Sequence, residues 1–173
     1  VAQGITYATA LQCARLNCLA GKLPEGLSRA DAQACFVDNL RFAAAQLKKA
    51  GIMLLIEPIN YYDIPGFFLN TTAQALAVLD AVGSDNLLIQ YDIYHAQRME
   101  GELAATMEKQ LSRIGHMQLA DNPGRNEPGS GEINYAFLFR HLDAIGYQGH
   151  VGCEYKPAAG TSAGLGWIKQ LGN

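Results

Sequence analysis

Four apolar segments of the chain end in, or close to, a side chain that offers an oxygen atom. These side chains are Glu57, Asp92, Gln118 and Glu154. In parallel α/β folds the carboxyl ends of the strands form the edge of the sheet where functional sites assemble. Carboxylate and amide oxygens are hard ligands that suit Mg²⁺ or Mn²⁺. A single carboxylate at such a position is as often a helix cap or half of an ion pair, but several in succession predict a divalent metal site.

Two glutamates beside a divalent metal suit a proton transfer next to a carbonyl group. One carboxylate removes a proton from carbon and another returns one, while the metal holds the carbonyl and hydroxyl oxygens of an α-hydroxy carbonyl compound. The net reaction is an isomerisation or an epimerisation, and it needs no organic cofactor. The sequence contains no P-loop, no G-x-G-x-x-G and no G-x-S-x-G motif. Walker-type phosphate hydrolysis, Rossmann redox chemistry and serine hydrolysis therefore lack support.

Two histidines lie near these positions. His95 follows Asp92 by three residues, in a predicted loop. A neutral imidazole there could bind metal, form a hydrogen bond with a substrate oxygen, or remain a plain surface residue. His116 shares a strand face with Gln118, because side chains two residues apart in a strand point the same way. A hydrogen-bonded core histidine is the preferred interpretation of His116, and a partner of the metal site is the alternative.

Two basic residues could hold the anionic part of a substrate. Arg125 lies in a long loop rich in glycine and proline, and Lys156 lies two residues beyond Glu154. Arginine suits bidentate binding of a carboxylate and lysine a point-charge contact, although loop cations are more often simply solvated. The neighbouring Cys153 is expected to pack in the interior.

Alternating strands and helices must position these side chains. Strands are predicted at Ala14–Leu19, Ile52–Pro58, Leu87–Asp92, Ile114–Asp121 and Gly149–Tyr155. Helices are predicted up to about Cys13, at Arg29–Ala50, from Asn70 or Thr71 to Val82, up to about Ser112, at Tyr135–Ile145 and around Leu165–Leu171. The strands begin about 34 residues apart, which suits the unit of a (β/α)8 TIM barrel. The predicted fold class is α/β, with about five βα units of such a barrel in this chain.

Length and composition narrow the class of protein further. A barrel of eight units needs about 250 residues, so we expect residues 1–173 to form a single domain that is the C-terminal part of a barrel. The chain has 13 Lys and Arg against 16 Asp and Glu, without the basic excess typical of nucleic-acid binding. The sequence lacks a run of about 20 apolar residues and a signal peptide, which argues against a membrane partner. Four cysteines without a C-x-x-C pair indicate a reducing, cytoplasmic compartment.

Several segments spread over nearly the whole chain resemble one family. They are "LLIEPIN", "IPGFFLNTTAQAL", "QYDIYHAQRMEG", "RIGHMQLADNPGRNEPGSGEINY" and "GHVGCEYKPA". The chain resembles the hydroxypyruvate isomerases of the xylose isomerase-like TIM barrel superfamily, which also contains tagatose epimerases and endonuclease IV. The resemblance implies interconversion of hydroxypyruvate and 2-hydroxy-3-oxopropanoate (tartronate semialdehyde). It also implies residue roles: Glu57 and Glu154 as the catalytic proton-transfer pair, Glu57, Asp92, Gln118 and Glu154 as ligands of Mg²⁺ or Mn²⁺, and His95, Arg125 and Lys156 as substrate contacts.

Three other interpretations stay open. The substrate could be another keto acid or a sugar, converted by an epimerase or isomerase of the same superfamily. An endonuclease IV-like repair enzyme would use a His-rich cluster of several zinc ions, and only His95 and His116 lie near the predicted site. The chain could also be a non-catalytic piece, because about three N-terminal βα units of the family have no counterpart here. Assembly into a homo-oligomer is left open by the sequence.

Overall fold

A computed structural model describes residues 1–171 of the chain. It divides into two compact units, Val1–Gln90 and Tyr91–Asn173, of which residues 172–173 lie outside the described part. The predicted last helix, around Leu165–Leu171, lies within the described residues, whereas the last two residues of the predicted domain 1–173 lie outside them. No helix within residues 1–171 is both long enough and apolar enough to cross a lipid bilayer.

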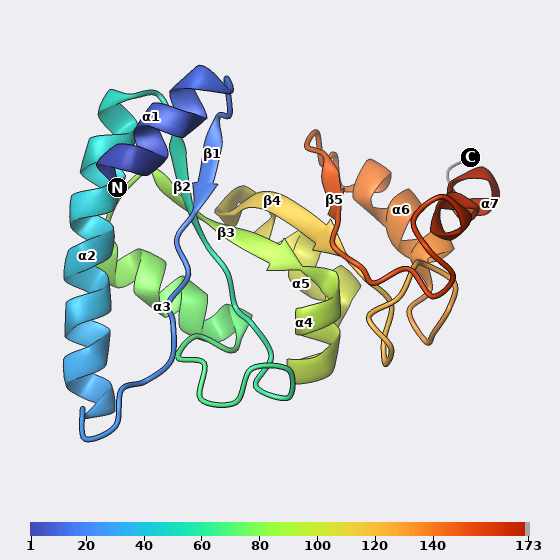
Figure 1. The fold of residues 1–173 in the computed structure, drawn as a ribbon, viewed down its shortest axis with the longest axis horizontal. Helices are drawn as coiled ribbons and strands as arrows, with labels where there is room; N and C mark the ends of the chain where they lie inside the picture. The colour runs from blue at the N-terminus through green and yellow to red at the C-terminus, as the bar shows by residue number, and fades with distance from the viewer. Residues whose placement is uncertain (172–173) are drawn as a thin grey trace. The chain divides into compact units, whose positions relative to one another are not determined.

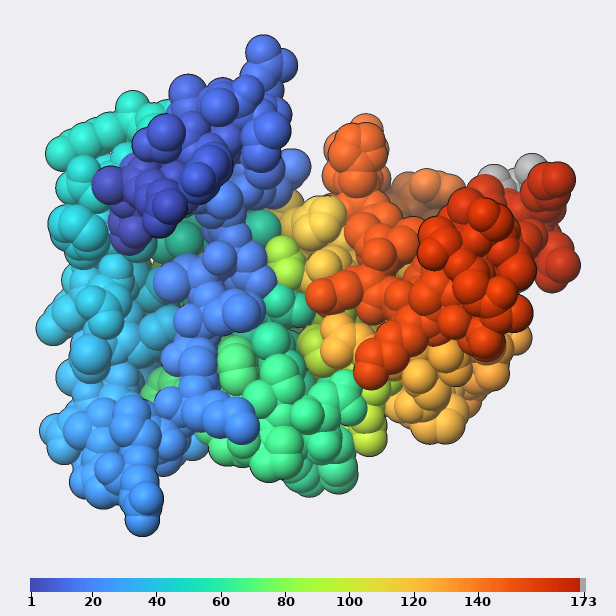
Figure 2. Space-filling model, viewed as in Figure 1, coloured from blue at the N-terminus to red at the C-terminus, as the bar shows by residue number. Residues whose placement is uncertain are grey.

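The first unit contains a parallel sheet with helices packed against it. Its elements are α1 (Ala2–Ala10), β1 (Arg15–Asn17), α2 (Arg29–Lys49), β2 (Met53–Ile56), α3 (Thr72–Val82) and most of β3 (Leu87–Asp92). The middle strand is β2, where Leu54 pairs with Leu16 of β1 and with Leu87 of β3. Within this unit α2 lies beside both β2 and α3 (Figure 1). The residues of α2 form much of the visible surface of the unit in the space-filling view (Figure 2).

Periodic apolar side chains build the core of the first unit. They are Phe36, Leu40, Ala44 and Leu47 of α2, Leu54, Leu55 and Ile56 of β2, and Ala75, Val78 and Leu79 of α3. Ser28 caps α2, since its hydroxyl oxygen accepts from the Asp31 amide at 3.1 Å. Thr71 rather than Asn70 caps α3, and its hydroxyl accepts from the Gln74 amide. Gly83 ends α3 in the left-handed conformation, with φ of 68°.

A buried amide joins α2 to the residue that precedes β2 in this unit. Nδ2 of Asn86 donates to the carbonyl oxygens of Ala44 and Ile52, at 3.2 and 2.9 Å. We predict that Asn86→Ala lowers the free energy of unfolding by about 1–3 kcal/mol, because it leaves buried acceptors with fewer partners. Urea denaturation would measure the change, with Asn39→Ala on the exposed side of α2 as the control. Equal stability of the two variants would contradict the prediction.

The second unit begins with the end of β3 and continues the alternation. It contains α4 (Ile93–Met99), α5 (Leu103–Gln110), η1 (Leu111–Arg113), β4 (Ile114–Leu119), α6 (Tyr135–Ala144), β5 (Val151–Cys153), η2 (Ala163–Leu165) and α7 (Ile168–Leu171). Strands β4 and β5 are parallel, and Gln118 pairs with Gly152. A helix follows each of the five strands, which confirms the predicted α/β class with five βα units (Figure 1).

Two local predictions for this unit were wrong. The segment around His95, predicted as a loop, forms α4 instead, because the carboxylate of Asp92 caps that helix. His95 is therefore a buried helical residue and not a loop residue, and 2% of it is exposed. Cys153 was expected in the interior, yet its side chain is exposed at the end of β5.

Candidate active site

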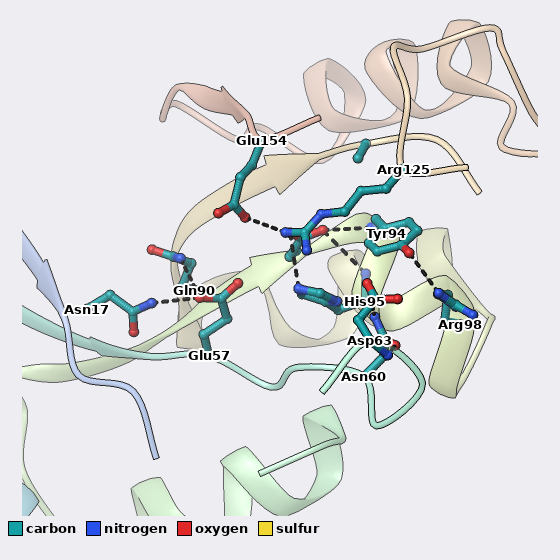
Figure 3. Close-up of polar contacts among 12 residues, drawn as sticks. Asn17, Glu57, Asn60, Asp63, Gln90, Tyr94, His95, Arg98, Arg125 and Glu154 are labelled. Atoms are coloured by element: carbon teal, nitrogen blue, oxygen red, sulfur yellow. Dashed lines mark hydrogen bonds and ion pairs between the residues drawn. The ribbon is translucent and has the colours of Figure 1, made fainter. Parts of the chain in front are cut away.

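In the first unit, Glu57 is the centre of a group of hydrogen bonds at the carboxyl ends of three strands. Glu57 directly follows β2 and is 4% exposed. Its Oε2 accepts from Nδ2 of Asn17, the last residue of β1, at 2.6 Å. The same oxygen accepts from Nε2 of Gln90 in β3 at 2.9 Å (Figure 3). These two amides orient the carboxylate and offset part of the cost of burying its charge.

Neither of these amide donors was predicted from the sequence. Gln90 could have been recognised as a candidate, because it is a polar residue inside the mostly apolar predicted strand Leu87–Asp92. The sequence around Asn17 gave little indication of its role, since it lies in a short strand whose polar residues could equally face solvent. Parallel pairing of β1, β2 and β3 brings the two amides to Glu57, and that pairing is a property of the tertiary structure.

In the second unit, Asp92 organises the start of α4. Its Oδ1 accepts from the backbone amides of Tyr94 and His95, at 2.8 and 3.3 Å. Its Oδ2 is buried and accepts no hydrogen bond from the described residues, and Nε2 of His95 lies 3.8 Å from it. Burial raises the pKa of Asp92 to about 6, and nearby Glu154 adds to the rise. Arg125 and the two amides act in the opposite direction but do not cancel the effect of burial on this pKa.

Arg125 and Glu154 form an ion pair in the same unit. Nη2 of Arg125 donates to Oε2 of Glu154 at 2.9 Å (Figure 3). The Glu154 side chain is 51% exposed, so solvent and small molecules can reach it. One ligand atom from each of Asp92, His95 and Glu154 lies within 4.8 Å of the others. The structure thus brings together three of the predicted site residues of this unit, with Arg125 beside them.

The other predicted site residues of the second unit, Gln118 and Lys156, lie in β4 and just after β5. Gln118 is half-buried in β4, and both it and His116 lie beside Gly152 of β5, which confirms that they share a strand face. The Lys156 side chain is exposed, while its backbone amide donates to the carbonyl oxygen of Arg125 at 2.7 Å. This backbone bond ties the segment after β5 to the loop that carries Arg125.

That loop, residues 121–133, is built around the carboxylate of Asp121, which was not among the predicted site residues. Asp121 is buried, and its two oxygens accept from the backbone amides of Asn122, Gly129, Gly131 and Ile133. A side chain at Gly131 would clash with the carbonyl oxygen of Asn122, so the loop requires glycine there. The sequence did contain an indication, because Asp121 is the last residue of the predicted strand Ile114–Asp121 and precedes a segment rich in glycine and proline. Asp121 therefore organises the loop and through it places Arg125.

A divalent cation fits the acceptors of the second unit. The buried Oδ2 of Asp92, which accepts no hydrogen bond from the described residues, is an oxygen that a cation could satisfy. His95 and Glu154 offer a nitrogen and an exposed carboxylate close to it. Such oxygen-rich sets with one imidazole suit Mg²⁺ and Mn²⁺.

Comparisons with known proteins agree with this architecture. The chain is 57% identical to "Hydroxypyruvate isomerase" of Escherichia coli K12, over 97% of this chain and 65% of that protein. It is 44% identical to "2-oxo-tetronate isomerase" of Cupriavidus necator, over 98% of this chain and 65% of that protein. The solved structure of an "AP endonuclease, family 2" from Brucella melitensis superposes with a TM-score of 0.93 at 39% identity. That superposition covers 98% of this chain and 65% of the Brucella chain.

The chain thus spans 65% of the length of these curated relatives. The sequence profile described as "Xylose isomerase-like TIM barrel" matches residues 1–171. Because that match covers nearly the whole chain, the chain belongs to the xylose isomerase-like TIM barrel family.

Proposed function

We propose that this chain carries the catalytic carboxylates of an isomerase that interconverts hydroxypyruvate and tartronate semialdehyde. The observation that carries the proposal is the 57% identity to the E. coli protein named hydroxypyruvate isomerase, along 97% of the chain. The residues at the strand ends support it, because the carboxylates and amides there are of the types that proton transfer needs. We also propose that residues 1–173 act as one domain in a reducing cytoplasm, where the free thiols of the chain persist.

Glu57 and Glu154 are the proton-transfer pair in this proposal. One carboxylate takes a proton from C3 of hydroxypyruvate and the other delivers a proton to C2, while the hydroxyl proton moves from the C3 oxygen to the C2 oxygen. The amides of Asn17 and Gln90 hold Glu57 in one orientation, which is what a base positioned against a carbon acid needs. The exposure of Glu154 leaves it accessible to substrate.

Glu57, Asp92, Gln118 and Glu154 are the proposed ligands of Mg²⁺ or Mn²⁺, and His95 is a neighbour of that set. The cation, when bound, would supply positive charge that stabilises the oxygen atoms of the substrate as the carbon-bound proton leaves. His95, Arg125 and Lys156 are the proposed substrate contacts. Arg125 already holds one carboxylate, that of Glu154, so its guanidinium has the chemistry to hold the carboxylate of hydroxypyruvate.

The test is isomerisation of hydroxypyruvate by the purified protein, followed by proton NMR in deuterated water. We expect tartronate semialdehyde to appear with deuterium at C2, and we expect EDTA to abolish the reaction and Mg²⁺ or Mn²⁺ to restore it. Protein that contains bound divalent metal and still leaves hydroxypyruvate unchanged would contradict the proposed reaction. An unchanged rate after complete metal removal would contradict the proposed role of the cation.

Metal binding is predicted to weaken in acid. Asp92 in the folded protein has a pKa of about 6, raised from its usual value by burial. Below that pH the carboxyl keeps its proton, so a cation must displace the proton to bind. We expect the Mn²⁺ dissociation constant to rise up to about tenfold between pH 6 and pH 5 and to change little between pH 7 and pH 8. Isothermal titration calorimetry measures it, and a constant value from pH 5 to pH 7 would contradict the prediction.

A second candidate substrate is a 2-oxo-tetronate, the four-carbon acid named in the C. necator relative. Both candidates are hydroxylated keto acids, so the same carboxylates and the same arginine would serve. A panel of 2-oxo-tetronate, hydroxypyruvate and neutral keto sugars, compared by kcat/KM, separates them. Tight, salt-dependent binding of abasic DNA would instead favour a repair function.

A further inference from the structure

Two guanidinium groups lie over the ring of Tyr94 in the second unit. Cζ of Arg125 is 5.3 Å from the centroid of this ring, and Cζ of Arg98 is 5.6 Å from it. A guanidinium within about 6 Å of an aromatic centroid is attracted by the negative face of the ring, and the attraction grows when water is excluded. Tyr94 therefore contacts Arg125, the arginine that forms the ion pair with Glu154.

Tyr94 is itself held at both ends. Its backbone amide donates to Oδ1 of Asp92 at 2.8 Å. Nη1 of Arg98 donates to its phenol oxygen at 2.8 Å (Figure 3). The residue is 1% exposed. A buried ring with a fixed backbone and a hydrogen-bonded hydroxyl has little freedom to change rotamer. It can thus act as a rigid surface for the guanidinium of Arg125.

The backbone of Arg125 is constrained as well. Its φ is 55°, in the left-handed region that non-glycine residues rarely adopt. Such a conformation persists only where surrounding contacts enforce it. One of those contacts is the amide of Lys156, which donates to the Arg125 carbonyl oxygen. The constrained backbone of Arg125 sets the direction of its side chain. Contacts with Tyr94 and Glu154 then fix the position of the guanidinium.

We propose that Tyr94 is a positioning residue that holds Arg125 ready for the carboxylate of the substrate, and that Arg98 holds Tyr94. The inference rests on the proposed function in taking the substrate to be a hydroxylated keto acid. An arginine side chain has many rotamers, so ordering the guanidinium before the substrate arrives removes an entropic cost of binding. Nη2 of Arg125 donates to Glu154, and the substrate carboxylate would accept from the same guanidinium. The arrangement favours acids over neutral sugars.

Binding of a non-reacting acid tests this role separately from catalysis. D-glycerate is the probe, measured by calorimetry against the Mg²⁺-loaded protein, and KM and kcat for hydroxypyruvate are measured in parallel. We expect Tyr94→Leu, which removes the ring, to weaken glycerate binding about tenfold and to raise KM by a similar factor. The value of kcat should change less than about threefold, because contacts equal in ground and transition states affect KM alone. Tyr94→Phe keeps the ring and should weaken binding about threefold.

Matched variants separate positioning from general damage. Tyr147→Phe removes the hydrogen bond that the phenol of Tyr147 donates to the carbonyl oxygen of His150. Arg140→Met removes a positive charge on the exposed side of α6. Both should bind glycerate as the parent protein does. Because Tyr94 is buried, Arg98→Met is the second variant if Tyr94→Leu fails to fold, and we expect it to weaken glycerate binding about threefold.

The outcomes of the two proposals can be told apart. Wild-type affinity for glycerate in folded Tyr94→Leu, or in Arg98→Met where that variant is used, would overturn the positioning role. Failure of the parent protein to bind glycerate would also overturn it. A parent protein that binds glycerate tightly but does not isomerise hydroxypyruvate would contradict the proposed reaction alone, and the Tyr94 comparison would still decide the positioning role.

Discussion

Replacing Glu154 by Gln is expected to lower kcat for hydroxypyruvate isomerisation about a thousandfold. A positioned acid–base group typically contributes about 10²–10⁴-fold to the rate, and the amide of Gln cannot exchange a proton at carbon. The substitution preserves shape, and its amide oxygen can still accept from Arg125 as Glu154 does at 2.9 Å. The loss should therefore appear in kcat, with the protein folded and the loop around Arg125 in place.

Glu57→Gln is expected to lower kcat by a similar factor for the same reason. Its amide oxygen can accept from Asn17 and Gln90, so the hydrogen bonds at this strand end survive. Hydrogen exchange at C3 of hydroxypyruvate in deuterated water adds a finer test. If one variant cannot isomerise hydroxypyruvate but still exchanges the C3 hydrogen, the glutamate that it retains is the base that removes the first proton.

Glu108→Gln is the matched control for both substitutions, because Glu108 is an exposed residue of α5 outside the candidate site. It should isomerise hydroxypyruvate at the parent rate. If either Glu57→Gln or Glu154→Gln also keeps the parent rate, the proposed proton-transfer pair is wrong.

A large effect on stability is expected for Asp121→Ala, which should lower the free energy of unfolding by about 3–5 kcal/mol. The substitution removes the acceptor of four backbone amides, and buried donors that lose a charged partner are costly to leave unsatisfied. It should also raise KM for hydroxypyruvate, because the loop that Asp121 organises carries Arg125. Thermal and urea unfolding measure the first effect, and initial rates measure the second.

The control for Asp121→Ala is Asp143→Ala, at an exposed position of α6. Surface substitutions of this kind usually change stability by less than about 0.5 kcal/mol. A similar loss of stability in the two variants would show that the hydrogen bonds of Asp121 do not organise the loop.

The fold was largely predictable because its patterns are local. The run Leu87–Asp92 is mostly apolar and its bounds match those of β3. Ser28 caps α2, as its position before a helical pattern indicates. The error at α4 has a local cause too. Asp92 was interpreted only as a site residue, although an aspartate is also a strong helix cap, and here its Oδ1 caps α4.

The candidate site was predictable to the extent that it follows strand ends. Parallel strands place their carboxyl ends at one edge, so Glu57 after β2 and Asp92 at the end of β3 could be selected from the chain alone. Partners that come from distant segments could not. Nothing in the local sequence around Asn17 shows that its amide donates to a carboxylate 40 residues away.

The sequence alone determined the alternation of strands and helices, the acidic residues at strand ends and the similarity to a family of isomerases. These follow from hydrophobic periodicity and from residue types, which are written along the chain. The role of the Asp121 carboxylate in the loop and the contacts of Tyr94 with Arg98 and Arg125 depend on how the segments of the chain pack together. The rise in the pKa of Asp92 through burial depends on that packing as well. Desolvation and side-chain contacts depend on what packs around a group, and that is set when separated segments meet.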